Sequence, residues 1–374
     1  MGGNSLKKHL GAPKIYILSM QRVLNFGSVL QAWSLRDMLM GIVDNQVLFL
    51  EIDGKTALPS NRSITEEADY DVPASYPPGI LQKAKRRCIK WLSSCNKKFI
   101  SKFMKAELGL DAPRCDEMPN LVVIGSDEVF NHAKGVNLQL HGDVAGANRV
   151  ITYAASCGSA LAGDVRPQDR DRVRSALGNI ESISVRDAAT QRYIAELTGR
   201  ETVRHLDPVL VGSLSQRKSR EVWLKKYLLV YAYGQRIRTE KEINAIRSFA
   251  RSKGLKTVAM GGSQFWCDLY IPASPMRLLD YFNSADYVVT DTFHGTIFSV
   301  INHKKFAVLA RPTNRSKIGG LLEDLDLSGR LLSDVEQLDS VLTSEIDYRK
   351  VDEILSRERE RAREYLRNQL EEKP

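Results

Sequence analysis

The sequence predicts an α/β protein built from two doubly wound domains that face a central cleft. Short apolar runs typical of strands alternate with stretches of helical periodicity. The alternation occurs twice, with a break near Leu214. A length of 374 residues also suits two domains better than one. Such alternation places a parallel sheet in each domain, with helices covering its faces.

The first domain is predicted over residues 12–214. Its β-α-β opening is a strand at Lys14–Ser19, a helix within residues 25–41 and a strand that starts at Gln46. Later strand-and-loop units start at Leu121, Arg149, Ile183 and Thr202. An insertion from about residue 54 to residue 107 adds a polar, proline-bearing stretch and then a basic amphipathic helix.

The second domain is predicted over residues 215–345. Its strands start at Tyr227, Leu255, Asp286 and Lys304, and its helices start at Glu240, Pro275 and Thr296. Residues 346–374 predict a charged C-terminal helix that packs back across the first domain.

Composition predicts a soluble cytoplasmic protein. The amino terminus has no apolar signal region, and no apolar run reaches the roughly 20 residues that a membrane span needs. The five cysteines form no CxxC pair and no Cys/His group at zinc spacing, which is typical of reduced thiols. We therefore expect neither a metal ion nor a resident cofactor.

Positive charge is concentrated in one segment of the chain. The formal net charge is +9, and the remainder of the chain is close to neutral, which argues against a general nucleic-acid binder. No acid lies between Asp71 and Glu107, and the cations there are Lys83, Lys85, Arg86, Arg87, Lys90, Lys97, Lys98, Lys102 and Lys105.

Two interpretations of this basic helix stay open. It either packs on the first domain, or it makes a peripheral contact with the anionic inner face of the cytoplasmic membrane. The apolar face of the helix is expected to consist of Leu81, Ala84, Cys88, Trp91, Leu92, Cys95, Phe99 and Phe103. If the helix packs on the first domain, we expect Leu81, Cys88, Trp91, Cys95 and Phe99 to make the contact.

Three predicted strands end in small polar residues that open a helix. In doubly wound sheets, ligands gather at this edge, where helix N-termini present free N–H groups. Ordinary helix capping explains each segment alone, but the three together predict a binding site. The candidate binding residues are Asn25, Gly27, Ser28, Gly125, Ser126, Thr292, Gly295 and Thr296.

Four further residues are candidates for chemistry at this edge. His294 stands at a glycine turn after a predicted strand, where it either caps the helix or exchanges protons near neutral pH. Asp127 either caps a helix or accepts a proton from a hydroxyl group. Arg186 and Arg315 lie at junctions suited to binding an anion, with an ordinary ion pair as the alternative for Arg186. We take His294, Asp127 and Arg186 as the catalytic candidates.

Taken together, six segments resemble the polysaccharide pyruvyl transferase family: NFGSVLQAWSL, VVIGSDEVFN, ITYAASCG, ISVRD, LDPVL and YFNSADYVVTDTFHGTIFSVINHKKFAVL. The similarity spans residues 14–325. It implies two Rossmann-like domains in a GT-B-like arrangement. The family's histidine falls on His294 and its strand-end arginine on Arg186. Some branches carry an arginine at the position of Thr292, and Arg315 is our candidate for that missing cation.

The resemblance also implies a reaction, in which pyruvate moves from phosphoenolpyruvate to a sugar as a cyclic ketal. The acceptor would be a polysaccharide or its lipid-linked precursor, as in exopolysaccharide or capsule synthesis. A histidine acid suits this reaction, because the enol carbon must be protonated before a sugar hydroxyl attacks. Two other functions stay open: a glycosyltransferase with a nucleotide-sugar donor in the same cleft, and a scaffold or peripheral membrane protein that works through its basic helix.

Overall fold

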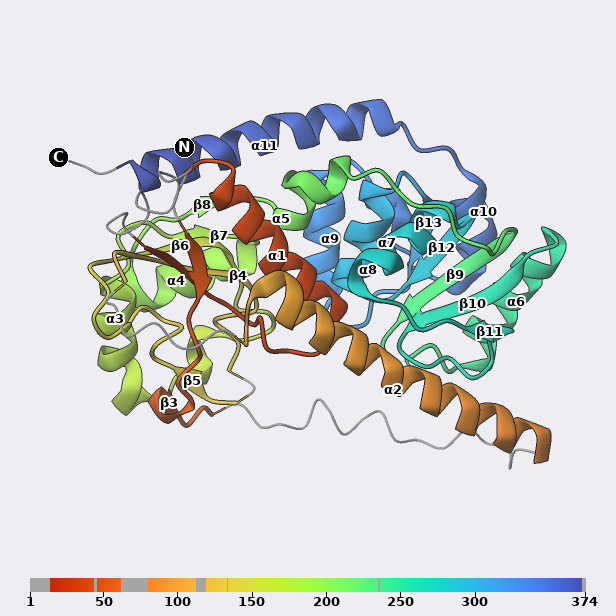
Figure 1. Ribbon diagram of the computed structural model, residues 1–374, viewed down its shortest axis with the longest axis horizontal. Helices are drawn as coiled ribbons and strands as arrows, with labels where there is room; N and C mark the ends of the chain where they lie inside the picture. Colours follow the sequence, from red (N-terminus) through yellow and green to blue (C-terminus); the bar gives the residue numbers. More distant parts are fainter. Residues whose placement is uncertain are drawn as a thin grey trace, which may run out of the picture.

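The computed structural model describes residues 14–43, 46–61, 80–111, 119–132, 134–234 and 236–371, without the side chains of residues 80–82. Two parallel sheets lie toward opposite ends of the long axis, each with helices on its faces (Figure 1). The predicted α/β class is therefore confirmed.

The first sheet has the strand order β2-β1-β4-β6-β7-β8, and neighbouring strands pair in parallel. All seven residues of β4 are buried, as expected of a central strand with both faces covered. The elements of this half are β1 (Ile15–Leu18), α1 (Phe26–Met40), β2 (Val47–Phe49), α2 (Ile80–Leu108), β4 (Leu121–Asp127), β6 (Arg149–Ala155), α3 (Arg170–Gly178), β7 (Ser184–Val185), α4 (Ala188–Thr198), β8 (Val203–Arg204) and α5 (Pro208–Val211).

The second sheet has the strand order β11-β10-β9-β12-β13, again with parallel neighbours. Its four longer strands begin within one residue of their predicted starts. The elements are β9 (Tyr227–Ala232), α6 (Glu240–Ser252), β10 (Lys256–Gly261), β11 (Leu269–Tyr270), α7 (Pro275–Ser284), β12 (Tyr287–Thr290), α8 (Phe293–Ile301), β13 (Lys305–Val308), α9 (Arg315–Asp324), α10 (Leu338–Thr343) and α11 (Tyr348–Leu370).

The insertion after β2 lies partly outside the described residues, since residues 62–79 are not among them. Its start forms a strand, β3 (Ala57–Leu58), which pairs in antiparallel fashion with β5 (Val136–Asn137). The sequence did not predict β3, β5 and β11, which have two residues each.

One apolar cluster crosses the boundary between the two sheets. It contains Leu30 of α1, Leu229 of β9 and Phe298 of α8, all fully buried. The two halves of the molecule therefore share a packed core at their junction, which holds side chains from both halves in fixed relative positions.

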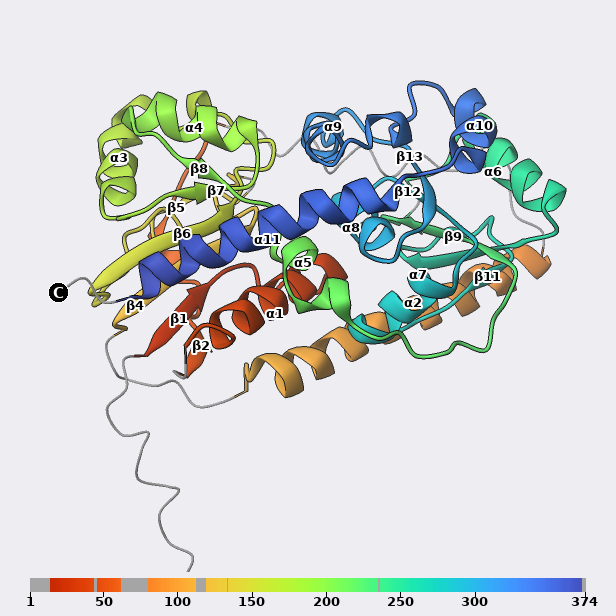
Figure 2. The same cartoon turned by 90° about the horizontal axis from the view of Figure 1, so that it is seen from above.

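Helix α11 returns from the second half and lies across the first, as predicted (Figure 2). The hydroxyl of Tyr365 donates to the carbonyl oxygen of Thr152 in β6 at 2.9 Å. The guanidinium of Arg149 donates to the carbonyl oxygen of Gln369 at 3.0 Å. Residues 372–374 of the predicted segment lie outside the described residues.

Helix α2 corrects the predicted apolar face. Cys88, Trp91 and Phe99 are exposed, and the side chain of Leu81 is outside the description. The buried apolar side chains of the helix are Ile89, Ile100, Phe103, Met104 and Leu108, of which Phe103 was predicted.

The buried face of α2 differs from the predicted apolar face because a polar residue lies at the centre of the buried one. Asn96 is buried, donates to the hydroxyl of Tyr270 at 2.7 Å and accepts from the backbone N–H of Ala273 at 3.1 Å. Both partners belong to the second half, so α2 bridges the two halves. Hydrophobic periodicity treats asparagine as a solvent-facing residue, so the buried face of α2 was predicted on the wrong side of the helix.

We expect Leu366→Ala to detach α11 from the shared core. Leu366 is fully buried in that cluster, and emptying such a site lowers the free energy of unfolding by about 2–5 kcal/mol. The neighbouring variant Arg367→Ala, at an exposed position, should change it by less than about 0.5 kcal/mol. Urea denaturation measures both, and equal effects would show that α11 is not held by its buried face.

Candidate active site

A cavity of about 270 Å³ opens between the two halves. Its wall includes residues that follow β9, β10 and β12, the start of α1, and one side of α2. In doubly wound folds the carboxyl ends of the strands are where ligands bind, so this cavity is the candidate active site.

Two helix N-termini reach the wall of this cavity, one from each half. Asn25 caps α1, and its side-chain oxygen accepts from the N–H of Gly27 at 2.7 Å. Thr292 caps α8, and its hydroxyl accepts from the N–H of Gly295 at 2.9 Å. Each N-terminus carries a partial positive charge, so the pair favours an anion between them.

His294 lies in the first turn of α8 and packs directly on the first turn of α1. A Cβ atom added to Gly27 would lie 2.2 Å from Nδ1 of His294, which is far inside contact distance. The imidazole thus occupies the volume that any side chain at position 27 would need. Glycine is required here by the close approach of the ring.

A buried carboxylate stands behind the imidazole. Asp207 caps α5, in the segment between the two sheets, and its side chain is fully buried. Its Oδ2 accepts from Nε2 of Gln31 at 2.6 Å and from Nη1 of Arg186 at 2.9 Å. Nε2 of His294 lies 3.6 Å from the same oxygen, an ion-pair distance rather than a full hydrogen bond.

These neighbours keep the carboxylate ionised. Burial alone would raise the pKa of Asp207, but His294 and Arg186 hold that pKa below its ordinary value. Burial likewise opposes the charge of Arg186, while Asp207 and Asp127 hold the pKa of its guanidinium above its ordinary value.

Two cations flank the ring of Phe293, the residue before the histidine. The guanidinium of Arg186 lies 4.3 Å from the ring centroid, and the ammonium of Lys317 lies 5.3 Å from it. Lys317 also pairs with Glu128, just after β4, and its charge lowers the pKa of Glu128 to about 2. Side chains from α8, α9, β7 and β4 therefore meet beside the cavity.

The sequence matches the family model described as polysaccharide pyruvyl transferase over residues 25–312, which begins at the α1 cap and includes the whole of α8. The chain belongs to the polysaccharide pyruvyl transferase family. No curated protein gives a significant match.

Solved structures support the fold of this pyruvyl transferase family member. A protein described as a UDP-N-acetylglucosamine 2-epimerase from Listeria monocytogenes is 12% identical, with a TM-score of 0.51 over 97% of this chain and 98% of that one. This likeness confirms a GT-B-like arrangement of two Rossmann-like domains, and at such low identity it shows the fold alone.

Two further structures were found. The S. aureus MnaA–UDP complex is 14% identical, with a TM-score of 0.48 over 97% of this chain and 99% of that one. An α,α-trehalose-phosphate synthase from Burkholderia xenovorans is 11% identical, with a TM-score of 0.49 over 96% and 98%.

The structure brings several of the candidate residues of this family member together. Asn25, Thr292 and His294 line the cavity. Ser126 is connected to Asp207 through Gln31, whose Nε2 donates to the Ser126 hydroxyl at 2.5 Å.

The other candidate residues are buried, bonded or closely packed within the fold. The Thr296 hydroxyl donates to the carbonyl oxygen of Thr292 inside α8, and Ser28 is buried in α1. Gly125 and Gly295 lie where a Cβ would meet the Tyr153 carbonyl oxygen and the Thr290 hydroxyl. Asp127 ends β4 and accepts from the next N–H at 2.9 Å. Their predicted roles toward substrate stay predictions.

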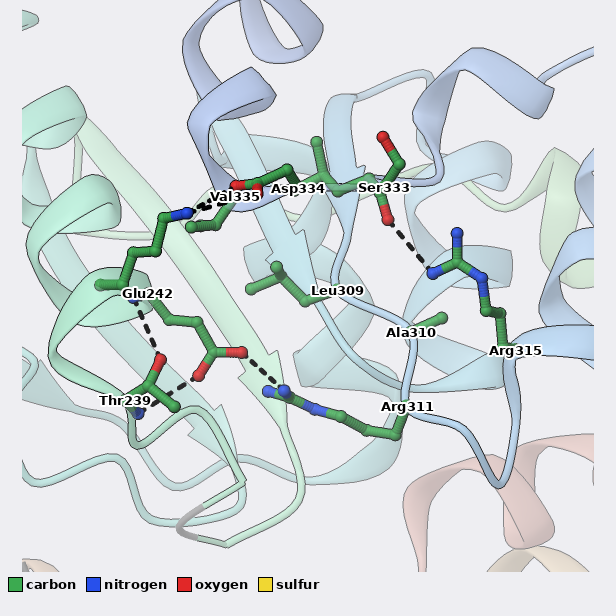
Figure 3. A pocket seen from close by; sticks show the side chains of 11 residues that line it. Thr239, Glu242, Leu309, Ala310, Arg311, Arg315, Ser333, Asp334 and Val335 are labelled. Atoms are coloured by element: carbon green, nitrogen blue, oxygen red, sulfur yellow. Dashed lines mark hydrogen bonds and ion pairs between the residues drawn. The ribbon is translucent and has the colours of Figure 1, made fainter.

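Arg315 lies in a different place from His294. It lines a second cavity of about 270 Å³, between α6 and the loop after β13, and donates to the Leu332 carbonyl oxygen at 3.3 Å (Figure 3). Arg311 lies in the same cavity, paired with Glu242. The cation of this segment that reaches the Phe293 ring is Lys317, two residues further along α9.

Four residues of this group were not predicted from the sequence: Gln31, Asp207, Lys317 and its partner Glu128. Asp207 lies in LDPVL, one of the six segments that resemble the family, and its place before a proline at a strand end was a usable signal. Gln31 gave no signal, because a glutamine in an amphipathic helix is ordinarily a surface residue.

Within the described ranges, no three His, Cys, Asp or Glu side chains are grouped in a way that would hold a metal ion. The expectation that the protein needs no metal and no resident cofactor stays a prediction.

Gly27→Ala should disturb the packing of His294, whereas Gly41→Ala, at the C-cap of the same helix, should not. The added methyl at position 27 overlaps the imidazole, and such overpacking costs about 1–3 kcal/mol. At Gly41 the nearest atom to an added Cβ is 3.4 Å away and φ is −75°, so alanine fits. Thermal unfolding tests the difference; two equally tolerated variants would mean that the ring is not held against α1.

The Glu128–Lys317 pair should stabilise the protein at neutral pH and lose this effect as the pH falls below the ordinary pKa of a glutamate, 4.5. The pKa of Glu128 is about 2 when folded, against an ordinary value of 4.5, so its contribution is complete above pH 5 and falls as pH drops below 4.5. Glu128→Gln should therefore cost on the order of 1–3 kcal/mol at pH 7, and progressively less toward pH 3. Urea denaturation against pH measures this, with exposed Glu364→Gln as the control. A cost independent of pH would contradict the assignment.

Proposed function

We propose that this protein is a pyruvyltransferase that moves pyruvate from phosphoenolpyruvate to a sugar of a polysaccharide, or of its lipid-linked precursor, as a cyclic ketal. The observation that supports this most directly is the position of His294. Its imidazole lies between two helix N-termini from opposite halves, at the wall of the cavity, with an ionised Asp207 behind it. Family membership gives the reaction class.

In the proposed reaction His294 acts as the general acid. Its imidazolium gives a proton to the methylene carbon of phosphoenolpyruvate, which becomes a methyl group and leaves an oxocarbenium-like carbon beside it. One sugar hydroxyl attacks that carbon, and its proton returns to the imidazole. The second hydroxyl then forms the second C–O bond as phosphate leaves with the remaining proton. The products are the ketal and inorganic phosphate, so atoms and protons balance.

Asp207 acts through His294 and is a positioning residue. Its Oδ2 lies 3.6 Å from Nε2 of His294, and its bonds to Gln31 and Arg186 hold the carboxylate in place. In an alternative mechanism, a carboxylate rather than His294 accepts the proton of the sugar hydroxyl. Asp127, at the end of β4, is the candidate for that role.

The donor has two anionic groups, a phosphate and a carboxylate, and needs several oriented N–H donors. The N-termini of α1 and α8 supply backbone N–H groups at the cavity. Lys97 of α2 contributes a cation to the same wall. Lys317 and Arg186 lie against the ring of Phe293, the residue between the cavity-lining Thr292 and His294. This distribution of positive charge supports a dianionic donor rather than a neutral one.

His294→Ala should lower turnover by about a hundredfold or more while the protein stays folded. The matched control is His303→Ala, two residues after the C-terminal end of α8, where the imidazole is exposed and pairs with Asp352. Release of inorganic phosphate from phosphoenolpyruvate, with a glycan fraction as acceptor, measures turnover. Near-normal release by the His294 variant would exclude the histidine as the acid.

Binding experiments separate this function from that of a nucleotide-sugar glycosyltransferase. Phosphoenolpyruvate should raise the melting temperature of the wild-type protein, and UDP-sugars should not. Lys317→Gln should weaken phosphoenolpyruvate binding by about tenfold, because a cation near the site is lost. Arg315→Gln should weaken it less, since Arg315 lines the other cavity. A shift with UDP-sugars alone would favour the glycosyltransferase, and a larger effect at Arg315 would restore it as the donor's cation.

A further inference from the structure

The outward face of α2 is a continuous cationic surface. We call this face the α2 basic face; its exposed members are Lys83, Arg87, Lys90, Trp91, Lys98, Lys102 and Lys105. At 3.6 residues per turn, Arg87, Lys98 and Lys102 fall on the same side of the helix as Trp91. The only acid on the helix is Glu107 in its last turn, and Lys105 pairs with Asp111 just beyond the helix at 2.9 Å. Repulsion among the other cations of this face is not compensated by acids along the helix.

Large aromatic side chains are exposed on the same helix. Trp91 is 67% exposed and lies in the middle of the α2 basic face, and Phe99 is 40% exposed at its edge. Tryptophan amid lysines and arginines is the arrangement found where a protein meets the interface of a lipid bilayer, since the indole ring is stable at headgroup level.

The opposite face of α2 is fully used inside the protein. Ile89 and Ile100 are buried, and Lys85 donates to the carbonyl oxygen of Cys267 at 2.6 Å. Arg86 lies over the Phe265 ring at 5.5 Å. Lys85 and Arg86 therefore hold the helix to the second half, which separates them in role from the cations of the α2 basic face.

We propose that the α2 basic face docks on an anionic lipid membrane. The cations would lie against the acidic headgroups, each contributing on the order of 1 kcal/mol, and Trp91 would enter the interface. None of the described helices is long and apolar enough to cross a membrane, so the contact would be peripheral. Charge elsewhere is close to balanced, which favours a surface of fixed negative charge opposite this one face.

The position of α2 connects this surface to the active-site cavity. Ser93, Asn96 and Lys97 of the same helix line that cavity, while Trp91 and Lys98 point away from it. Helix α2 forms one edge of the molecule, and α11 runs along the opposite edge (Figure 1). Docking through α2 would therefore place the cavity beside the membrane surface, where a lipid-linked sugar is held.

The test is co-sedimentation with vesicles, without any substrate, so that its outcome does not depend on the proposed reaction. The probes are vesicles of phosphatidylcholine alone and of phosphatidylcholine mixed with phosphatidylglycerol, each at low and at physiological salt. We expect binding to the anionic vesicles only, weaker at the higher salt because the charges are screened.

Two variants address the surface directly. Replacing Arg87, Lys90, Lys98 and Lys102 with glutamine should lower binding to anionic vesicles by about a hundredfold or more. Trp91→Ala should lower it by about tenfold, through loss of one interfacial aromatic side chain. None of these residues lines the cavity, so turnover on a soluble acceptor should be unchanged.

Matched controls exist elsewhere on the chain. Glutamine at Arg349, Arg357, Arg363 and Arg367 removes four exposed cations from α11, and Trp223→Ala removes a tryptophan that is 72% exposed. Both should bind anionic vesicles like the wild type. Binding to neither vesicle type, equal binding to both, or loss in the controls equal to that in the α2 variants would overturn the proposal. Salt-sensitive binding to duplex DNA with no vesicle binding would overturn it as well.

Discussion

The side chain of Asp207 is an anion without solvent contact, and the arrangement of the active site depends on how that charge is compensated. Removing a carboxylate from water costs several kcal/mol unless donors and cations surround it. Here Gln31 comes from α1, Arg186 from the end of β7 and His294 from α8, and all three converge on one oxygen. The need to compensate one charge therefore joins both sheets and positions the imidazole.

The cluster around this charge explains why the cavity can receive a multiply charged ligand. Arg186 pairs with Asp207, and Lys317 pairs with Glu128, so these buried ions are compensated within the protein. The helix N-termini at Asn25 and Thr292 add positive potential without adding a formal charge. Such a site attracts an anion through helix N-termini and exposed cations rather than through unpaired buried cations.

Much of the fold could be predicted from the sequence, and the site only in part. Continuous apolar runs identify strands such as β4 and β12. Asn25, Thr292 and His294 can be predicted as site residues because they follow such strands. Gln31 could not be found, because its burial results from tertiary packing rather than from periodicity. Arg315 and Lys317 are two residues apart on α9, which puts them on opposite sides of the helix. Which one approaches Phe293 depends on the rotation of that helix, about which the sequence contains no information.

The contact between Gly27 and His294 has a consequence for sequence variation. The ring fills the space of a missing side chain, so a substitution at position 27 is compatible only with a smaller or displaced residue at position 294. The two positions are 267 residues apart in the chain (294 minus 27), yet they constrain each other as directly as neighbours in a helix. Related sequences that keep the histidine in this pose must keep the glycine, and those that lose the glycine are candidates for a different chemistry.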